Sequence, residues 1–443
     1  MGFYEEYQQK KKTLEEAYAL LKDGDFIWTC EASAEPLTFK RHLHEMHGKV
    51  HDLILYAGLS AERAPICDDE YADLISFESL FFPRYLTPLQ KTGRASYMPM
   101  HLRNAGLDTI YRYKYTGRHI NFLVLTVSPM DKHGYFTSGS TAINIRDLVE
   151  YADHIIVEVN ESNPRTFGDT YIHISEVDTI IDSEDNKIIY IPVRDPNETD
   201  AVIGKTIAEL VNDGDTVQLG IGGIPTACAR ELTHKKHLGI HTEMLNDGLV
   251  YLLKSGAIDN TAKNYYQNKI ITTFSMGSKD VYDYIDDNPN ILHLRSAYVN
   301  QPAIISRNDN FVSINTTLQI DLMGQCASEA IGTSQISGVG GQTDTAVGAK
   351  ESNGGRAVIA LHSTRELKQK DGTKKRVSNI YPVHPKGTVI SLMRNDVDFV
   401  ITEYGVAALR GASLKERATS LINIAHPDFR DELTEAAKKW YLI

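Results

Sequence analysis

The sequence predicts an α/β protein made of two tandem, related, open α/β domains. Two observations carry this prediction: short apolar runs alternate with helical patterns along the chain, and a helix, an Asp-Gly turn and a strand recur in each half. Such alternation is typical of mostly parallel sheets covered by helices. With 443 residues, 42% of them apolar, the chain is long enough for two or three ordinary domains with sizeable cores.

Strands are expected where short apolar runs occur, and helices where apolar residues recur with the helical period. The expected strands lie at residues 53–56, 122–125, 155–159, 216–219, 358–361 and 399–402. The expected helices lie at residues 14–22, 201–212, 227–232 and 413–424. Both kinds of element occur in each half of the chain, as the predicted fold class requires.

Two segments of the chain resemble each other. Residues 19–25 read ALLKDGD and residues 209–215 read ELVNDGD. Their offset of about 190 residues is too long for a solenoid repeat and suits two copies of one fold, although the motif is also common in α/β proteins generally. Because Pro196 and Asn197 cluster after Asp195, we expect one domain over residues 1–195 and a second over residues 196–443.

Charge and composition exclude several classes of function. The net charge of −12 argues against a nucleic-acid binder, whose affinity rests on Lys and Arg neutralising phosphates. The four cysteines form no CxxC pair, so neither a zinc site nor a disulfide framework is expected. The charged start lacks the apolar core of a secretory signal, and the chain lacks an apolar run long enough to span a membrane. We therefore expect a cytoplasmic protein without membrane contact.

Two basic clusters are assigned to solvated surface. His42, His44, His47 and His51 do not form the His-Glu-x-x-His pattern, so a helix face exposed to solvent is preferred over a metal site. The basic residues at 368–376 surround Asp371 and Gly372 and are expected to form the tip of a β-hairpin. Contact of this tip with ligand phosphates is the alternative.

A glycine-rich loop follows the strand expected at residues 216–219. It comprises Gly220, Ile221, Gly222, Gly223 and Ile224, and Pro225 then suits the first turn of a helix. A strand, a glycine turn and a helix start direct backbone N–H groups at one spot, which favours phosphate or developing negative charge. Pro225 breaks the dinucleotide fingerprint, and no Lys-Ser/Thr pair makes a P-loop. A tight turn that needs glycine for steric reasons is the alternative.

A single carboxylate, Glu243, follows the apolar stretch at residues 238–242. The carboxyl end of a strand is where open α/β sheets bind ligands. As a nucleophile Glu243 would attack a thioester and give a mixed anhydride and a thiolate, which attacks back to form a glutamyl thioester. A helix-capping charge, a base and a metal ligand are the alternatives. Glu403 is a rival carboxylate at another strand end, and His241 would either orient Glu243 or be structural.

Motifs in both halves resemble the acetyl-CoA hydrolase/transferase family of CoA-transferases, in particular its butyryl-CoA:acetate and 4-hydroxybutyrate CoA-transferases. In the first half they are VSPMDKHGYF (127–136), VEVNE (157–161) and IHISEVD (172–178). In the second half they are the loop at 220–225, HTEM (241–244), GVGGQ (338–342), TEYGVA (402–407) and LINIAHPDFR (421–430). Together these motifs cover nearly the whole chain.

The resemblance implies two tandem domains of the CoA-transferase fold, with the catalytic residue and the CoA-binding loops in the second. It implies that Glu243 forms the glutamyl-CoA thioester and that Gly220, Ile221, Gly222, Gly223 and Ile224 form a CoA-binding loop. It places Gly341 in a second CoA loop near the reacting carbonyl and His362 near the CoA chain. It implies CoA as substrate, no prosthetic group or metal, a short-chain carboxylate as the second substrate and a homo-oligomer.

The resemblance predicts transfer of CoA between a short acyl-CoA, such as butyryl-CoA, and acetate. An acyl-CoA hydrolase, a 4-hydroxybutyrate CoA-transferase and a CoA-binding protein without catalysis are the alternatives. Thr345 and Val347 stand where many relatives have Phe and Arg, which leaves the acyl-chain preference open.

Overall fold

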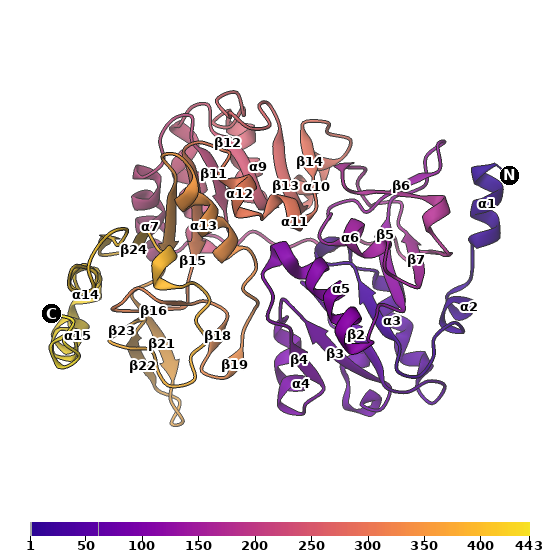
Figure 1. Cartoon of the computed structure of the whole chain (residues 1–443), viewed down its shortest axis with the longest axis horizontal. Coiled ribbons are helices and arrows are strands. Elements are labelled where there is room, and N and C mark those ends of the chain that lie inside the picture. Colours follow the sequence, from indigo (N-terminus) through magenta and orange to yellow (C-terminus); the bar gives the residue numbers. More distant parts are fainter. Residues whose placement is uncertain (1, 61) are drawn as a thin grey trace.

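The computed structural model describes residues 2–60 and 62–443 of the chain. Two sheets, each covered by helices, lie side by side, and the two chain ends lie at opposite sides of the molecule (Figure 1). We call the part up to Asp195 the N-terminal half and the rest the C-terminal half.

Among the described residues, the sheet of the N-terminal half has seven strands, all parallel, in the order β10-β7-β5-β1-β2-β3-β4. In chain order the strands are β1 (Phe26–Thr29), β2 (Leu53–Tyr56), β3 (Ile75–Ser79), β4 (Ala95–Tyr97), β5 (Phe122–Val127), β7 (His154–Val159) and β10 (Thr179–Asp182).

The second sheet has the order β25-β24-β20-β15-β11-β12-β13-β14-β8, and only β25 is antiparallel to its neighbour among these described strands. The strands are β8 (Phe167–Gly168), β11 (Thr216–Leu219), β12 (Gly239–Leu245), β13 (Ile270–Ser275), β14 (Ile291–His293), β15 (Phe311–Thr316), β20 (Arg356–Ala360), β24 (Phe399–Thr402) and β25 (Gly405–Ala408). Because β8 belongs to the N-terminal half, it ties the two halves together.

The two sheets share one topology, which confirms that the halves are related in fold. In each, the first strand after the Asp-Gly turn is central: β1 lies between β5 and β2, and β11 lies between β15 and β12. The outer strands correspond too, with β7 and β10 matching β20 and β24 on one side, and β3 and β4 matching β13 and β14 on the other. The weak sequence repeat therefore reflects a repeated sheet.

Helices cover both sheets, and short strands form small additional sheets. The helices are α1 (Phe3–Lys10), α2 (Leu14–Tyr18), α3 (Leu37–His42), α4 (Thr87–Lys91), α5 (Ala105–Thr116), α6 (Ile145–Val149), α7 (Glu198–Glu209), α8 (Gly223–Glu231), α9 (Asp247–Ser255), α10 (Lys279–Ile285), α11 (Ser296–Val299), α12 (Pro302–Ile305), α13 (Gln342–Glu351), α14 (Leu414–Asn423) and α15 (Pro427–Lys439). The remaining strands are β6 (Tyr135–Thr137), β9 (Tyr171–His173), β16 (Gln319–Asp321), β17 (Cys326–Ala327), β18 (Ala330–Ile331), β19 (Ser334–Gln335), β21 (Thr364–Lys368), β22 (Lys374–Ser378) and β23 (Ile380–Tyr381).

The predicted strands are confirmed with shifts of one or two residues at their ends, and β21 and β22 confirm the hairpin. The helix expected at residues 14–22 is wrong in its length, because α2 ends at Tyr18. The N–H of Lys22 donates to the side chain of Asp25 at 2.7 Å and not to a helical carbonyl, so the chain turns before β1. The apolar pattern extends past the helix because Leu21 is still buried.

The domain boundary at 195/196 stays a proposal. It falls between β10 and α7, in a stretch without helix or strand.

Across the described ranges 2–60 and 62–443, no helix is both long and apolar enough to cross a membrane.

The repeated Asp-Gly turn has the same hydrogen bond in both halves. Asp25 accepts from the N–H of Lys22 at 2.7 Å, and Asp215 accepts from the N–H of Asn212 at 2.6 Å. Only the second turn adds a contact that the first lacks among the described residues: Arg356 of β20 donates to Asp215 at 2.7 Å. Asp215 thus also fixes β20 against the start of β11.

We predict that Asp215→Ala destabilises the protein more than Asp25→Ala. The first change leaves the partly buried Arg356 without its carboxylate, at a cost of about 3 kcal/mol, whereas the second loses one capping hydrogen bond, at about 1 kcal/mol. Unfolding midpoints in denaturant, measured side by side, test this order. Equal midpoints would mean that the contact with Arg356 contributes nothing.

Candidate active site

Glu243 lies within β12 and not after it. Met244 and Leu245 continue the strand, because they pair with Phe274 and Ser275 of β13. The expectation that the strand ends at Glu243 is therefore wrong by two residues, because β12 continues to Leu245. The consequence is chemical: the carboxyl group is held by a paired strand, which fixes its position more firmly than a loop would.

Two donors hold the Glu243 carboxyl group. The amide of Asn300 donates to Oε2 at 2.7 Å, and the backbone N–H of Gly341 also donates to this carboxyl group. A Cβ atom on Gly341 would lie 1.9 Å from Oε2, so a side chain there and the present position of Glu243 exclude each other. The backbone of Gly341, with φ of −101°, would suit any residue, and the constraint is therefore space alone.

Burial raises the pKa of Glu243 to about 7, since the charged form loses its water. The hydrogen bonds from Asn300 and Gly341 act in the opposite direction and lower this pKa. The negative charges of Asp344 and Glu31 add to the rise. The carboxyl group is thus protonated or ionised according to pH in the neutral range.

Asn300 was not found by the sequence reasoning. It follows α11, and the preceding residue, Val299, accepts a hydrogen bond from Nε2 of His241 at 2.8 Å. Burial lowers the pKa of His241 to about 3, so its ring is neutral and Nε2 carries the proton. This contact fits the expectation of a structural His241. It also fixes the chain at Val299, next to Asn300, which binds Glu243.

The glycine loop joins β11 to α8, as the sequence predicts. Gly222 precedes α8 with φ of 115°, a conformation that favours glycine. The first N–H groups of α8 have no partner within the helix, as at every helix start. The amide of Asn246 fixes the other end of the loop by donating to the carbonyl oxygen of Gly220 at 3.1 Å.

A first cavity of about 130 Å³ lies beside Glu243, and both halves of the chain form its wall. The C-terminal half contributes Gln218, Gly220, Ile221, Gly340, Gly341 and Gln342, among others. The N-terminal half contributes Glu31, Leu59, Leu80, Phe81, Leu102 and Ile143. Most of these side chains are apolar, and no Lys or Arg occurs among the described residues that line the cavity.

A second cavity of about 340 Å³ lies on the other side of the glycine loop. Gly222, Gly223 and Ile224 line it, while Ile221 lines both cavities. His362 lies in its wall and contacts Asp200 at 2.7 Å. Arg194 and Arg365 line the same space. The structure therefore brings Ile221, Gly222, Gly223 and Ile224 of the predicted loop together with His362 at the second cavity. Gly220 lies at the first cavity, together with Gly341 and Glu243.

The two halves are joined next to Glu243. Asp344, in the first turn of α13, forms an ion pair with Arg103 and accepts from the N–H of Arg103 at 3.2 Å. The N–H of Leu102 donates to the carbonyl oxygen of Gly340 at 3.4 Å. The wall of the first cavity that contains Leu102 is thus tied directly to the loop that contains Gly341.

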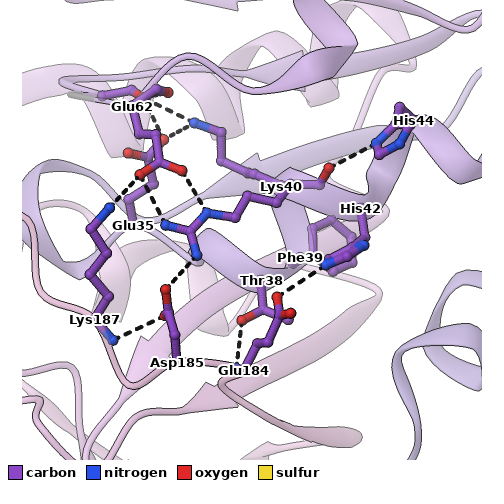
Figure 2. Close-up of polar contacts among 12 residues, drawn as sticks. Glu35, Thr38, Phe39, Lys40, His42, His44, Glu62, Glu184, Asp185 and Lys187 are labelled. Atoms are coloured by element: carbon purple, nitrogen blue, oxygen red, sulfur yellow. Dashed lines mark hydrogen bonds and ion pairs between the residues drawn. The ribbon is translucent and has the colours of Figure 1, made fainter.

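A buried ion pair lies beside Ser60, the residue that follows Leu59 in the chain. Lys40 of α3 pairs with Glu35 (Figure 2). The ammonium group of Lys40 also donates to the Ser60 hydroxyl at 2.9 Å. Nearby, Glu62 contacts Lys187 at 3.1 Å (Figure 2). These contacts fix the chain on the C-terminal side of Leu59 to the body of the N-terminal half.

The other candidates from the sequence have different roles. Glu403 accepts hydrogen bonds from the backbone and hydroxyl of Ser363, at 3.0 and 2.5 Å. The Asn315 amide donates to the Thr345 hydroxyl at 3.0 Å. Asn315 lines the first cavity, whereas Thr345 is outside its lining. Of the four histidines, only His42 lies on an α-helix of the described residues, at the end of α3, so the expectation that they share one helix face is wrong. The His42 ring contacts the carboxyl groups of Glu45 and Glu184.

Known proteins match both halves of this chain. The acetyl-CoA hydrolase/transferase N-terminal domain matches residues 1–192, and the C-terminal domain of the same family matches residues 277–437. The succinyl-CoA:cyclohexane-1-carboxylate CoA transferase of Geobacter metallireducens is 39% identical over 99% of this chain and 97% of its own. The 4-hydroxybutyrate coenzyme A transferase of Clostridium kluyveri is 37% identical over 99% of this chain and 100% of its own.

A solved structure gives the same result for the fold. RipA from Yersinia pestis superposes with a TM-score of 0.91 at 38% identity, and the match covers 100% of both chains. Full-length matches of this kind, together with the matches to both family domains, show the family of this chain. The chain belongs to the acetyl-CoA hydrolase/transferase family and is a CoA-transferase.

Proposed function

We propose that this enzyme moves CoA between a short-chain acyl-CoA, butyryl-CoA or a similar one, and acetate, with Glu243 as the nucleophile. The observation that carries the proposal is the position of the Glu243 carboxyl group. It lies in a small, mostly apolar cavity, next to the N–H of Gly341 and to the loop that separates this cavity from the second one.

The proposed reaction has two halves of two steps each. The ionised Glu243 attacks the thioester carbonyl, the C–S bond breaks, and an acyl-glutamyl anhydride and CoA thiolate form. The thiolate then attacks the glutamyl carbonyl, the anhydride C–O bond breaks, and the first carboxylate leaves. Acetate attacks the glutamyl-CoA thioester, and the same steps in reverse release acetyl-CoA. The N–H of Gly341 and the amide of Asn300 are placed to stabilise oxyanions at this carbon.

The two cavities suit the two parts of an acyl-CoA. The acyl chain occupies the apolar first cavity, and CoA extends along the loop of Gly220 to Ile224 into the second. The Asp200 carboxyl group lies against this loop, since a Cβ atom at Gly223 would be 2.2 Å from its Oδ2. A carboxyl group at this point disfavours phosphate, so we expect the uncharged pantetheine arm there. The phosphates then lie toward Arg194 and Arg365. His362, which contacts Asp200, borders the CoA chain.

Hydrolysis is the main alternative, since water would intercept the same anhydride. The side chains around the first cavity favour transfer, because Leu59, Leu80 and Phe81 are apolar and exclude water from the reacting carbon. A CoA-binding protein without catalysis would not need a carboxyl group at this position. A 4-hydroxybutyrate CoA-transferase is the substrate variant, supported by the name of the Clostridium kluyveri relative.

A cytoplasmic location and a homo-oligomeric state are part of the same proposal. They rest on composition and on the family resemblance.

We expect Glu243→Ala to lower CoA transfer by roughly a thousandfold or more, because no other carboxyl group takes over the covalent step. Butyryl-CoA is incubated with and without acetate, and acetyl-CoA and free CoA are quantified by chromatography. Acetyl-CoA that appears only with acetate and wild-type enzyme supports transfer. Free CoA released at the same rate without acetate shows a hydrolase, and near-full transfer by the variant shows that another group is the nucleophile. CoA binding by the variant, which should persist, serves as the control.

The pH dependence of kcat/KM should report the ionisation of Glu243 in the free enzyme. Since only the carboxylate attacks and its pKa is about 7, activity should rise as the pH increases through 7 and then level off. Asn300→Ala removes a hydrogen bond that lowers this pKa, so the rising limb should move to higher pH. A wild-type profile that is already level at pH 5, or a limb that moves down in the variant, contradicts this assignment.

Gly341→Ala should reduce transfer by about a hundredfold or more, because the added methyl group displaces Oε2 of Glu243 from the reacting position. The backbone conformation accepts alanine, so the thermal unfolding midpoint should change little. Steady-state kinetics with butyryl-CoA and acetate give the loss. Wild-type activity in this variant would show that Glu243 works from a different position.

A further inference from the structure

We propose that Glu31 recognises the far end of the acyl chain and selects four-carbon acyl groups that end in a hydroxyl group over those that end in a methyl or a carboxylate group. This inference rests on the proposed function, because it assumes that the acyl chain lies in the first cavity. It assigns a specificity-determining role to a residue of the N-terminal half.

The repeated fold explains why Glu31 and the glycine loop line the same cavity. Glu31 is the second residue after β1, as Ile221 is the second residue after the corresponding β11. Both residues line the first cavity. The loops that follow the two central strands therefore face one cavity, and the N-terminal half contributes an acidic side chain where the C-terminal half contributes the glycine loop.

The Glu31 side chain is firmly held and nearly inaccessible, with 5% of its surface exposed. The Tyr56 hydroxyl donates to Oε1 at 2.8 Å, and the backbone N–H of Leu59 donates as well. Tyr56 in turn stacks on Trp28 with 3.6 Å between ring centroids. A carboxyl group fixed by two donors cannot turn away from a ligand at little cost, which is what discrimination requires.

Glu31 still has room to accept a hydrogen bond. A carboxylate offers about four acceptor positions, and Tyr56 and Leu59 use two. Burial raises its pKa to about 7, so both the ionised and the protonated form are available near neutral pH, and a hydroxyl group can pair with either. An acyl chain that ends in a hydroxyl group finds a partner here, whereas a methyl group finds none.

A terminal carboxylate is disfavoured for a separate reason. The first cavity already contains the carboxyl groups of Glu31 and Glu243, and its described lining includes no Lys or Arg. The charge of Glu31 is close enough to Glu243 to raise its pKa, and a third carboxyl group between them would be repelled further. A buried carboxylate without a cationic partner is costly.

Three four-carbon acids that differ only at the far end test the proposal: 4-hydroxybutyrate, butyrate and succinate. Each serves as acceptor with acetyl-CoA as CoA donor, and kcat/KM is measured for the wild type, Glu31→Leu and Glu31→Gln. The wild type should prefer 4-hydroxybutyrate to butyrate and butyrate to succinate. Glu31→Leu should lower the 4-hydroxybutyrate to butyrate ratio by roughly tenfold or more. Glu31→Gln, which keeps a partner for Tyr56, should raise the succinate to butyrate ratio by a similar factor.

Glu158→Gln is the matched control. Glu158 is also a buried glutamate of the N-terminal half, but it accepts from the N–H of Phe39 at 3.0 Å and is outside the lining of the first cavity. This change should leave both ratios unaltered. A wild-type preference for butyrate over 4-hydroxybutyrate, or unchanged ratios in both Glu31 variants, overturns the proposal. If Glu31→Leu fails to fold, the test rests on Glu31→Gln: a raised succinate to butyrate ratio supports the proposal, and an unchanged ratio overturns it. Absence of transfer to every acid by the wild type instead overturns the proposed function.

Discussion

The surroundings of Glu243 meet one constraint that the proposed role as nucleophile sets: a carboxyl group shielded from water still has to ionise. Burial alone would keep it protonated, so donors must reach it, and they must leave room for a substrate carbonyl. The N–H of Gly341 satisfies both demands because glycine adds no side chain at a spot 1.9 Å from Oε2. Asn300 supplies the second donor, and the contact between His241 and Val299 fixes the chain beside it.

The tandem fold supplies the cavity around this carboxyl group. Each sheet ends its central strand in a loop, and residues of both loops line the first cavity. One loop has become a glycine turn that opens toward the second cavity, and the other presents Glu31. Because Arg103 and Leu102 bind Asp344 and Gly340, the halves are held together at the point where the reaction would occur. Under the proposed function, divergence between two copies of one fold separates the binding of CoA from the recognition of the acyl group.

Sequence patterns predicted the parts of the site that lie close together along the chain. Apolar runs gave the strands, and glycines with Pro225 gave the loop between β11 and α8. The end of α2 was missed because the side chain of Asp25, beyond the helix, takes the N–H of Lys22. Asn300 was missed because a single asparagine, 57 residues after Glu243, has no pattern that marks it. Glu31 was missed as a site residue because only the packing of the two halves brings it to the cavity.

Relatives of this chain include both CoA-transferases and acetyl-CoA hydrolases, and in the proposed mechanism the same anhydride leads to either outcome. The chemistry at Glu243 therefore does not separate them; access of water to the anhydride does. In this protein Leu59, Leu80 and Phe81 of the N-terminal half form an apolar part of the cavity wall, while Glu243, the proposed nucleophile, belongs to the C-terminal half. We infer that the fate of the intermediate is decided at the contact between the halves. The Lys40–Glu35 pair, which binds Ser60 next to Leu59, and the Arg103–Asp344 pair next to Leu102 hold the chain on both sides of that contact. Neither pair includes a residue that lines the first cavity.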